Sequence, residues 1–274
     1  MELKDYERLQ DSEKLRQLEL MVPELGRADI RQLAKQVVES IADENQRRFG
    51  RIFLGSLLVR VGELGAAEEL ASQLPPPSRA FLLAEIADKL ATRDGSVALV
   101  YLKKADEVAD SEPEEDRRSS AQEKIACVYT DLKEWERARE IVNKIKNPFD
   151  KSFDLCMLAH ALVASAQNDL ASQLVREAET LVDTIEPPHQ AGVLDDIAKV
   201  YISLGDRERA HKTWRRAVPL TEYDQDQSKL RLRICRAFMS LGDQAHAREV
   251  ALMITNPLHR KEALVIVGDK RGSA

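Results

Sequence analysis

Aromatic residues make up only 5% of this 274-residue chain, and runs in which Val, Ile or Thr alternate with polar residues are missing. Because such runs are typical of half-buried strands, their absence argues against β-sheet as the main element. The sequence also lacks any run of about eighteen apolar residues, which argues against a membrane-spanning helix. Only three cysteines are present, without close spacing, so a disulfide framework is not expected.

A strong charge of one sign is absent as well. The 41 basic and 47 acidic residues give a net charge of −6, which disfavours a nucleic-acid partner. The first ten residues, MELKDYERLQ, carry too many charges for a signal peptide. We therefore expect a cytoplasmic protein that does not bind membranes and for which nucleic acid is a disfavoured partner.

Sequence motifs of catalysis and nucleotide binding are also missing. The chain has no G-x-x-x-x-G-K-[ST], G-x-G-x-x-G, H-E-x-x-H or G-x-S-x-G. Its many acidic residues are scattered at helical spacing, which is typical of a solvated helix face. We predict no catalytic residues, no cofactor and no enzymatic activity.

What the chain does contain is a repeated pattern. The stretch VYISLGDRERAHKTWRRAV, residues 200–218, predicts the end of one helix, a break at Gly205 and the start of another helix. Similar stretches occur along the chain, and when they are aligned on one alanine of the second helix, that alanine recurs every 31 to 40 residues. The aligned positions are Ala67, Ala98, Ala138, Ala171, Ala210 and Ala247. A period of this length indicates a stack of repeated units.

Each unit is predicted to be a pair of amphipathic helices. In the unit around Gly205, apolar residues recur at i, i+3, i+4 and i+7 before the break, and Ala210, Trp214, Ala217 and Val218 form a second helical face after it. A left-handed glycine ends the first helix, and Asp206 can cap the second. Small residues at the aligned positions would let two helices cross closely. All ten prolines are predicted to lie at junctions, because a proline inside a helix costs about 3 kcal/mol.

The clearest unit resembles a tetratricopeptide repeat. The residues that match the family pattern are Ala198, Tyr201, Gly205, Ala210, Trp214 and Ala217. Another unit departs from the pattern, since Lys133 stands where the turn glycine is expected. The resemblance implies an all-α superhelix of about six helical hairpins.

We expect one continuous domain with three parts. Residues 1–48 would form an N-terminal helical pair, over about 2–22 and 28–45, and residues 49–258 would form the repeat array. Residues 259–274 would form a capping helix and tail. That last helix is apolar without a hairpin partner, so it could cap the stack on one side or join two copies of the chain.

The resemblance also implies that the first helix of each hairpin lines a concave groove, where peptides bind in this family. The groove residues that we predict are Phe49, Ile52, Phe81, Asp88, Glu123, Phe153, His160, Asp195, Lys199, Lys229, Arg233 and Arg236. The phenylalanines would supply exposed apolar contacts, and the basic stripe near the C-terminus would hold a carboxylate or phosphate. The alternatives are that the phenylalanines belong to the core and that the basic residues pair with nearby acids.

Cys156 and His160 lie four residues apart on a predicted helix, and Cys127 would lie on the first helix of the adjacent hairpin. Three such side chains could begin a zinc site. A fourth ligand is not evident, and cysteine is a common packing residue in helices. We therefore predict no metal.

The leading hypothesis is a non-enzymatic adaptor that binds a protein or peptide segment in the groove. A second hypothesis is a structural protein that assembles with itself through its ends, including a homo-oligomer through the C-terminal helix. A third hypothesis is an RNA-binding helical repeat. It is weaker than the other two because the chain is acidic and has few aromatic residues on which bases could stack.

Overall fold

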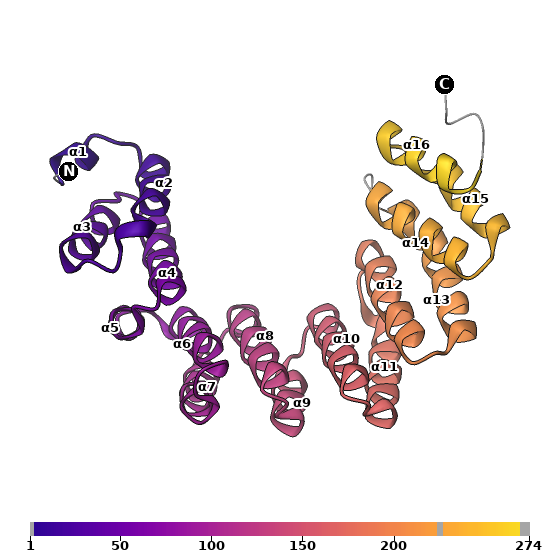
Figure 1. Cartoon of the computed structure of the whole chain (residues 1–274), viewed down its shortest axis with the longest axis horizontal. Helices are drawn as coiled ribbons and strands as arrows, with labels where there is room; N and C mark the ends of the chain where they lie inside the picture. The colour runs from indigo at the N-terminus through magenta and orange to yellow at the C-terminus, as the bar shows by residue number, and fades with distance from the viewer. Residues whose placement is uncertain (1–2, 224–226, 269–274) are drawn as a thin grey trace. The chain divides into compact units, whose positions relative to one another are not determined.

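The structure of the protein, a computed structural model, describes residues 3–223 and 227–268. Within these two ranges the chain forms only helices and their connections, with no strand (Figure 1). The prediction of an all-α fold is confirmed. In the same ranges, no helix is both long enough and apolar enough to cross a bilayer.

The chain divides into two compact units, Met1–Lys144 and Ile145–Ala274. The N-terminal unit holds α1 (Lys4–Glu7), α2 (Asp11–Met21), the 3-10 helix η1 (Val22–Glu24), α3 (Ala28–Glu39), α4 (Glu44–Val61), α5 (Leu64–Ser72), α6 (Pro76–Ala91), α7 (Gly95–Asp110), α8 (Glu115–Asp131) and α9 (Trp135–Lys144). The C-terminal unit holds α10 (Pro148–Ala164), α11 (Asn168–Leu181), η2 (Val182–Thr184), α12 (Pro187–Ser203), α13 (Arg207–Leu220), η3 (Thr221–Tyr223), α14 (Ser228–Ser240), α15 (Gln244–Met253) and α16 (Pro257–Ile266). The expected array at 49–258 therefore contains the division between these units.

Consecutive helices pack as hairpins in both units. The six pairs are α4–α5, α6–α7 and α8–α9 in the first unit, and α10–α11, α12–α13 and α14–α15 in the second. First helices also pack on first helices of the next hairpin, as α4 does on α6 and α12 does on α14. A helical-repeat fold is thus shown, with the predicted number of hairpins.

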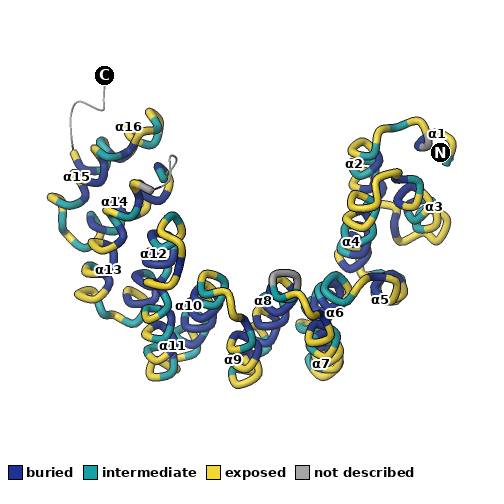
Figure 2. The backbone as a smooth tube through the Cα atoms, turned by 180° about the vertical axis from the view of Figure 1, so that it is seen from behind, coloured by how far each residue is buried: buried dark blue, intermediate teal, exposed yellow. Residues whose placement is uncertain are grey.

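The aligned alanines lie where the hairpin helices cross. All six are fully buried, and buried and exposed stretches alternate along the helices (Figure 2). Gly55 on α4 shows how close one crossing is, because a Cβ atom there would lie 2.4 Å from Leu82 Cδ2 on α6. The Leu82 side chain of the next first helix therefore packs directly over the small residue on α4.

The breaks between paired helices have the expected chemistry. Gly205 and Gly242 are left-handed, with φ of 81° and 82°. After each glycine an aspartate caps the next helix, since Asp206 accepts from the Arg209 backbone N–H and Asp243 from that of His246. Lys133 adopts the same left-handed geometry, with φ of 61°, although it has a side chain. The turn shape is therefore kept even where the glycine is missing.

Replacing Lys133 by glycine should stabilise the chain by about 1 kcal/mol, because a left-handed residue with a Cβ is strained. Urea unfolding followed by circular dichroism would measure the gain. The matched control is Lys103→Gly, the same change at an exposed position inside α7. It should lower stability by about 1 kcal/mol, since glycine is a poor helix former. If both substitutions lowered the free energy of unfolding, or both raised it, Lys133 would not be strained.

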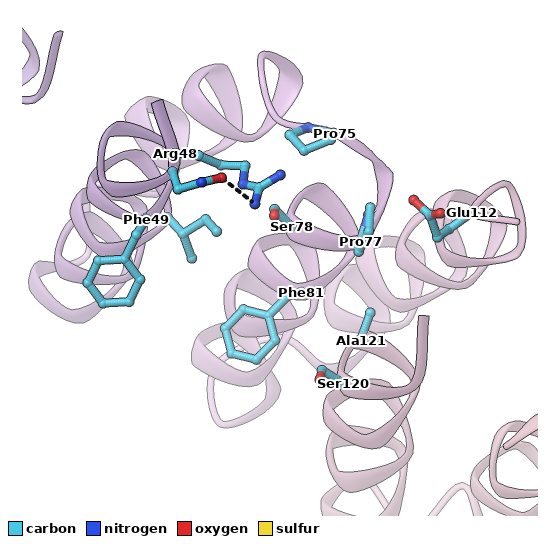
Figure 3. Close-up of a pocket in the computed structure, with 11 residues that line it drawn as sticks. Arg48, Phe49, Pro75, Pro77, Ser78, Phe81, Glu112, Ser120 and Ala121 are labelled. Atoms are coloured by element: carbon cyan, nitrogen blue, oxygen red, sulfur yellow. Dashed lines mark hydrogen bonds between the residues drawn. The ribbon is translucent and has the colours of Figure 1, made fainter. Parts of the chain in front are cut away.

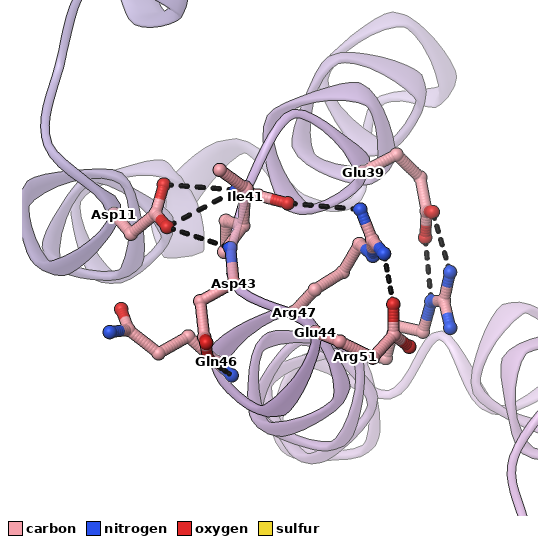
Figure 4. A network of polar contacts seen from close by, with 9 residues as sticks. Asp11, Glu39, Ile41, Asp43, Glu44, Gln46, Arg47 and Arg51 are labelled. Carbon is pink, nitrogen blue, oxygen red and sulfur yellow. Dashed lines mark hydrogen bonds and ion pairs between the residues drawn. The ribbon is translucent and has the colours of Figure 1, made fainter.

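The N-terminal segment differs from its prediction in detail. The helix expected over about 2–22 is interrupted between α1 and α2, and the helix expected to reach residue 45 ends at Glu39. The Asp11 carboxylate accepts hydrogen bonds from the backbone N–H groups of Ala42 and Asp43, which ends α3 and starts α4 (Figure 4). An Arg51–Glu39 pair, with distances of 2.7 and 2.6 Å, joins the same helices. This segment therefore packs as part of the first unit.

Two other expectations at the C-terminal end need correction or refinement. Pro219 lies inside α13, as its penultimate residue, and not at a junction. Its missing N–H removes one hydrogen bond from the last turn, and α13 ends one residue later, at Leu220. The final helix, α16, begins two residues earlier than expected and buries Ala263 and Val267, while Val265 is exposed. It is thus covered on one side.

Candidate functional site

The N-terminal unit has a hollow on the face formed by the first helices of its hairpins. It is a cavity of about 450 Å³ whose lining comes from α4, α6, α8 and the turns before α6 and α8. The lining residues are Asn45, Arg48, Phe49, Ile52, Pro75, Pro77, Ser78, Phe81, Glu112, Ser120 and Ala121. Three predicted groove residues, Phe49, Ile52 and Phe81, thus lie together.

Phe49 and Phe81 make this pocket aromatic. Phe49 is 55% exposed, and its ring stacks on that of Phe53 with centroids 6.1 Å apart. Figure 3 shows the Phe49 and Phe81 rings projecting from neighbouring helices on one side of the pocket. Phe81 is half-buried. The core alternative is therefore wrong for Phe49, whose ring faces solvent.

The pocket also has polar groups of both signs. Arg48 is exposed on α4, where its Nη2 donates to Asn45 Oδ1 at 3.4 Å. Glu112 is buried between α7 and α8, and its Oε1 accepts from the Glu114 backbone N–H at 3.0 Å. An apolar floor with a few placed polar groups is the usual composition of a ligand pocket.

A second hollow, also about 450 Å³, lies further along α4 and α6 and includes the predicted residue Asp88. Asp88 pairs with Lys124 at 2.6 Å, and Ser56 Oγ donates to Glu85 Oε2 at 2.5 Å. The pKa of Glu85 is raised, mainly by burial and to a smaller degree by the charge of Asp88. The hydrogen bond from Ser56 and the charge of Lys124 lower this pKa but do not cancel the rise. Glu123, the remaining predicted residue of this unit, is half-buried on α8.

In the C-terminal unit, α10 carries two exposed phenylalanines, Phe149 and the predicted groove residue Phe153. Phe153 is 44% exposed, and Met157, one turn later, is exposed beside it in the helix. His160 is half-buried with its Nδ1 3.4 Å from Ser203 Oγ, and burial lowers its pKa. Cys156 is buried, and burial raises the pKa of its thiol.

Asp195 differs from its prediction as a groove residue, because it is only 1% exposed. Its Oδ1 accepts from Trp214 Nε1 at 2.9 Å, and its Oδ2 faces Lys199 Nζ at 2.8 Å and Arg233 Nη2 at 2.9 Å. Burial lowers the pKa of Lys199, but hydrogen bonds to Asp195 and Asp196 outweigh it and raise that pKa overall. The structure thus joins three predicted residues in a polar cluster in which Asp195 is buried and the side chains of Lys199 and Arg233 are exposed.

The basic stripe on α14 is partly occupied by acids of the chain itself. Arg233 pairs with Asp195, and Arg236 pairs with Glu262 of α16. Lys229 is exposed. The alternative of pairing with nearby acids therefore holds for both arginines, which weakens the case for an anion site here.

Comparison with known proteins gives only distant likenesses. No protein-family model matches the chain, and no curated protein matches it. Among solved structures, a Rap protein complexed with competence and sporulation factor is 12% identical, with 96% of this chain and 78% of that chain covered at a TM-score of 0.43.

Two further solved structures resemble the chain to a similar degree. Ton1535 from Thermococcus onnurineus NA1 is 14% identical, with 93% and 89% of the two chains covered and a TM-score of 0.39. Acl4, an assembly chaperone of RpL4, is 17% identical, with 97% and 98% covered and a TM-score of 0.43. At these scores the likenesses carry no argument about what this chain binds.

Some pocket residues are not among the predicted ones. Arg48 precedes Phe49, so it lies at the edge of the predicted helix face, and Pro75 and Glu112 come from the turns before α6 and α8. Turn residues have no helical period from which to place them. Met157 could have been found, because it lies four residues after Phe153 on one helix.

Proposed function

We propose that the protein is a non-enzymatic adaptor that binds a protein or peptide segment on the first-helix face of its N-terminal unit. The observation that carries this proposal is the pocket in which Phe49, Ile52 and Phe81 converge. We also propose that the hairpins are tetratricopeptide repeats and that the protein acts in the cytoplasm.

The composition of the pocket favours an apolar side chain as the anchor of the ligand. A volume of about 450 Å³ accommodates one large aromatic or aliphatic group and part of its backbone. The Phe49 ring stacks on Phe53 and is 55% exposed, so a ligand that covers it would bury apolar surface, which favours binding. Arg48 at the rim can donate to a peptide carbonyl or carboxylate.

A peptide library displayed on phage, selected on the full chain, would test this function. We expect enriched peptides to share an aromatic or aliphatic anchor. Fluorescence polarisation should then show binding weakened at least tenfold, about 1.4 kcal/mol, in Phe49→Ser and in Phe81→Ser. Circular dichroism would verify that both variants fold.

Val100→Ser is the matched control, because Val100 has the same exposed fraction as Phe49, 55%, but lies on α7, outside the pocket. It should bind as the unchanged chain does. If Val100→Ser weakened binding as much as Phe49→Ser, or if no peptide were enriched, the pocket would not be the binding site.

Self-assembly through the C-terminal end is a second candidate, favoured by exposed apolar side chains on α16. Leu258 and Val265 are both exposed there. Light scattering at increasing concentration would detect dimers, and Val265→Glu should abolish them if this end joins two copies. A monomer at all concentrations would remove this candidate.

A further inference from the structure

Two histidines and an aspartate come together between the last two hairpins of the C-terminal unit. His211 lies on α13, Asp243 in the turn before α15, and His246 in the first turn of α15. Asp243 Oδ2 lies 2.6 Å from His211 Nε2 and 2.6 Å from His246 Nδ1. All three donor atoms lie within 4.8 Å of one another.

The backbone and a buried ring hold these side chains in place. Gly242, with φ of 82°, turns the chain so that Asp243 begins α15. Asp243 Oδ1 accepts from the His246 backbone N–H at 3.1 Å, which leaves Oδ2 facing both imidazoles. The buried Phe238 ring packs against both histidines, with centroids 5.3 and 5.4 Å away.

Capping of α15 alone does not account for the two histidines. At the preceding break, Asp206 caps α13 through the Arg209 backbone N–H at 2.9 Å. When Ala210 is aligned with Ala247, Arg209 of α13 stands at the position of His246. When Ala171 is aligned with Ala210, Ser172 of α11 stands at the position of His211. The cap is therefore made without imidazoles in one hairpin, so the imidazoles at the next break need another explanation.

We propose that His211, Asp243 and His246 bind a divalent transition-metal ion, with Zn²⁺ as the ion that fits the donor set. Two imidazole nitrogens and one carboxylate oxygen are three donors that zinc takes in proteins, and imidazole selects transition metals over Mg²⁺ and Ca²⁺. Nothing in the proposed adaptor function depends on this site, so the two proposals stand or fall separately.

Only a small rearrangement is needed to admit the ion. In a tetrahedral zinc site with bonds of about 2.0–2.1 Å, donor atoms lie about 3.4 Å apart. Asp243 Oδ2 would therefore draw back from each imidazole by less than about 1 Å, and the two imidazole nitrogens, which lie within 4.8 Å of each other, would take up the same spacing. Each histidine would carry its proton on its other ring nitrogen, so the binding nitrogen offers its lone pair to the metal.

The site has access to solvent. All three side chains are partly exposed. His246 also lines a cavity of about 450 Å³ with Arg215, Glu222 and Glu249. Water from this side would complete the coordination, as in zinc sites with three protein ligands.

Calorimetric titration of the metal-stripped full chain with ZnCl₂ would test the proposal. We expect one Zn²⁺ per chain, similar binding of Co²⁺, and no binding of Mg²⁺. His211→Gln, His246→Gln and Asp243→Asn should each weaken Zn²⁺ binding at least tenfold, since each removes a ligand. His189→Gln, a histidine outside the cluster, is the control and should leave the affinity unchanged.

A second measurement keeps the test valid if a variant does not fold. In the unchanged chain, nitrogen NMR should show Zn²⁺ on Nε2 of one histidine and Nδ1 of another. Absence of one-to-one binding, or affinity unchanged in all three ligand variants, would overturn the proposal. Loss of binding on Cys156→Ser or His160→Gln, with the three ligand variants unaffected, would place zinc elsewhere and overturn it too.

Discussion

Trp214→Ala is expected to lower the free energy of unfolding by about 3–5 kcal/mol. Trp214 is buried on α13, and its indole N–H donates to the buried carboxylate of Asp195. The substitution removes the packing of a large ring and also deprives an internal carboxylate of a donor. Urea unfolding followed by circular dichroism would measure the loss.

Lys212→Ala, two residues earlier on the same helix, is the control. Lys212 is exposed and pairs only with the exposed Glu208. Because exposed ion pairs contribute little, the change should stay within about 0.5 kcal/mol. Similar losses from both substitutions would mean that the buried face of α13 is wrongly assigned.

Ala247→Arg should cost at least about 4 kcal/mol and leave the last hairpin unfolded. Ala247 is fully buried where α15 packs on α14. A guanidinium group there would overpack the crossing and bury a charge without a partner. Thermal unfolding and limited proteolysis near residues 240–255 would detect the change.

The same substitution two residues earlier provides the comparison. Ala245 is exposed on α15, so Ala245→Arg places the same side chain in solvent. It should change stability by less than about 0.5 kcal/mol. Proteolysis of Ala245→Arg at the rate of Ala247→Arg would contradict the close packing at the aligned alanine.

The fold could be predicted from the sequence because it depends on local patterns. A buried alanine and a turn recur in each hairpin, and aspartates cap the second helices α7, α13 and α15. These patterns are local, so the helix pairs follow from spacing alone. The division after Lys144 could not be predicted, since it depends on how many contacts neighbouring hairpins make. The prediction that every proline lies at a junction is wrong for Pro219, which stands inside α13 one residue before its end.

The candidate site was predicted only in part, for physical reasons. Phe49 and Phe81 occupy helix positions with a known period, whereas Glu112 comes from a turn without one. Asp195 is a predicted groove residue because the tetratricopeptide resemblance places it on the inward face of a first helix. Its burial depends on Trp214 and Arg233, which belong to other helices and cannot be placed beside it from the sequence alone.

The left-handed residues with side chains affect how the protein unfolds. Lys133 and Ala166 lie in the turns of α8–α9 and α10–α11, the hairpins that precede and follow the division at residue 144 along the chain. In a repeat protein each hairpin contacts mainly its neighbours along the chain, so local unfolding begins at the least stable adjacent hairpins. Fluctuations should therefore begin midway along the polypeptide, and amide protons of these two hairpins should exchange with solvent earlier than those of α12–α13.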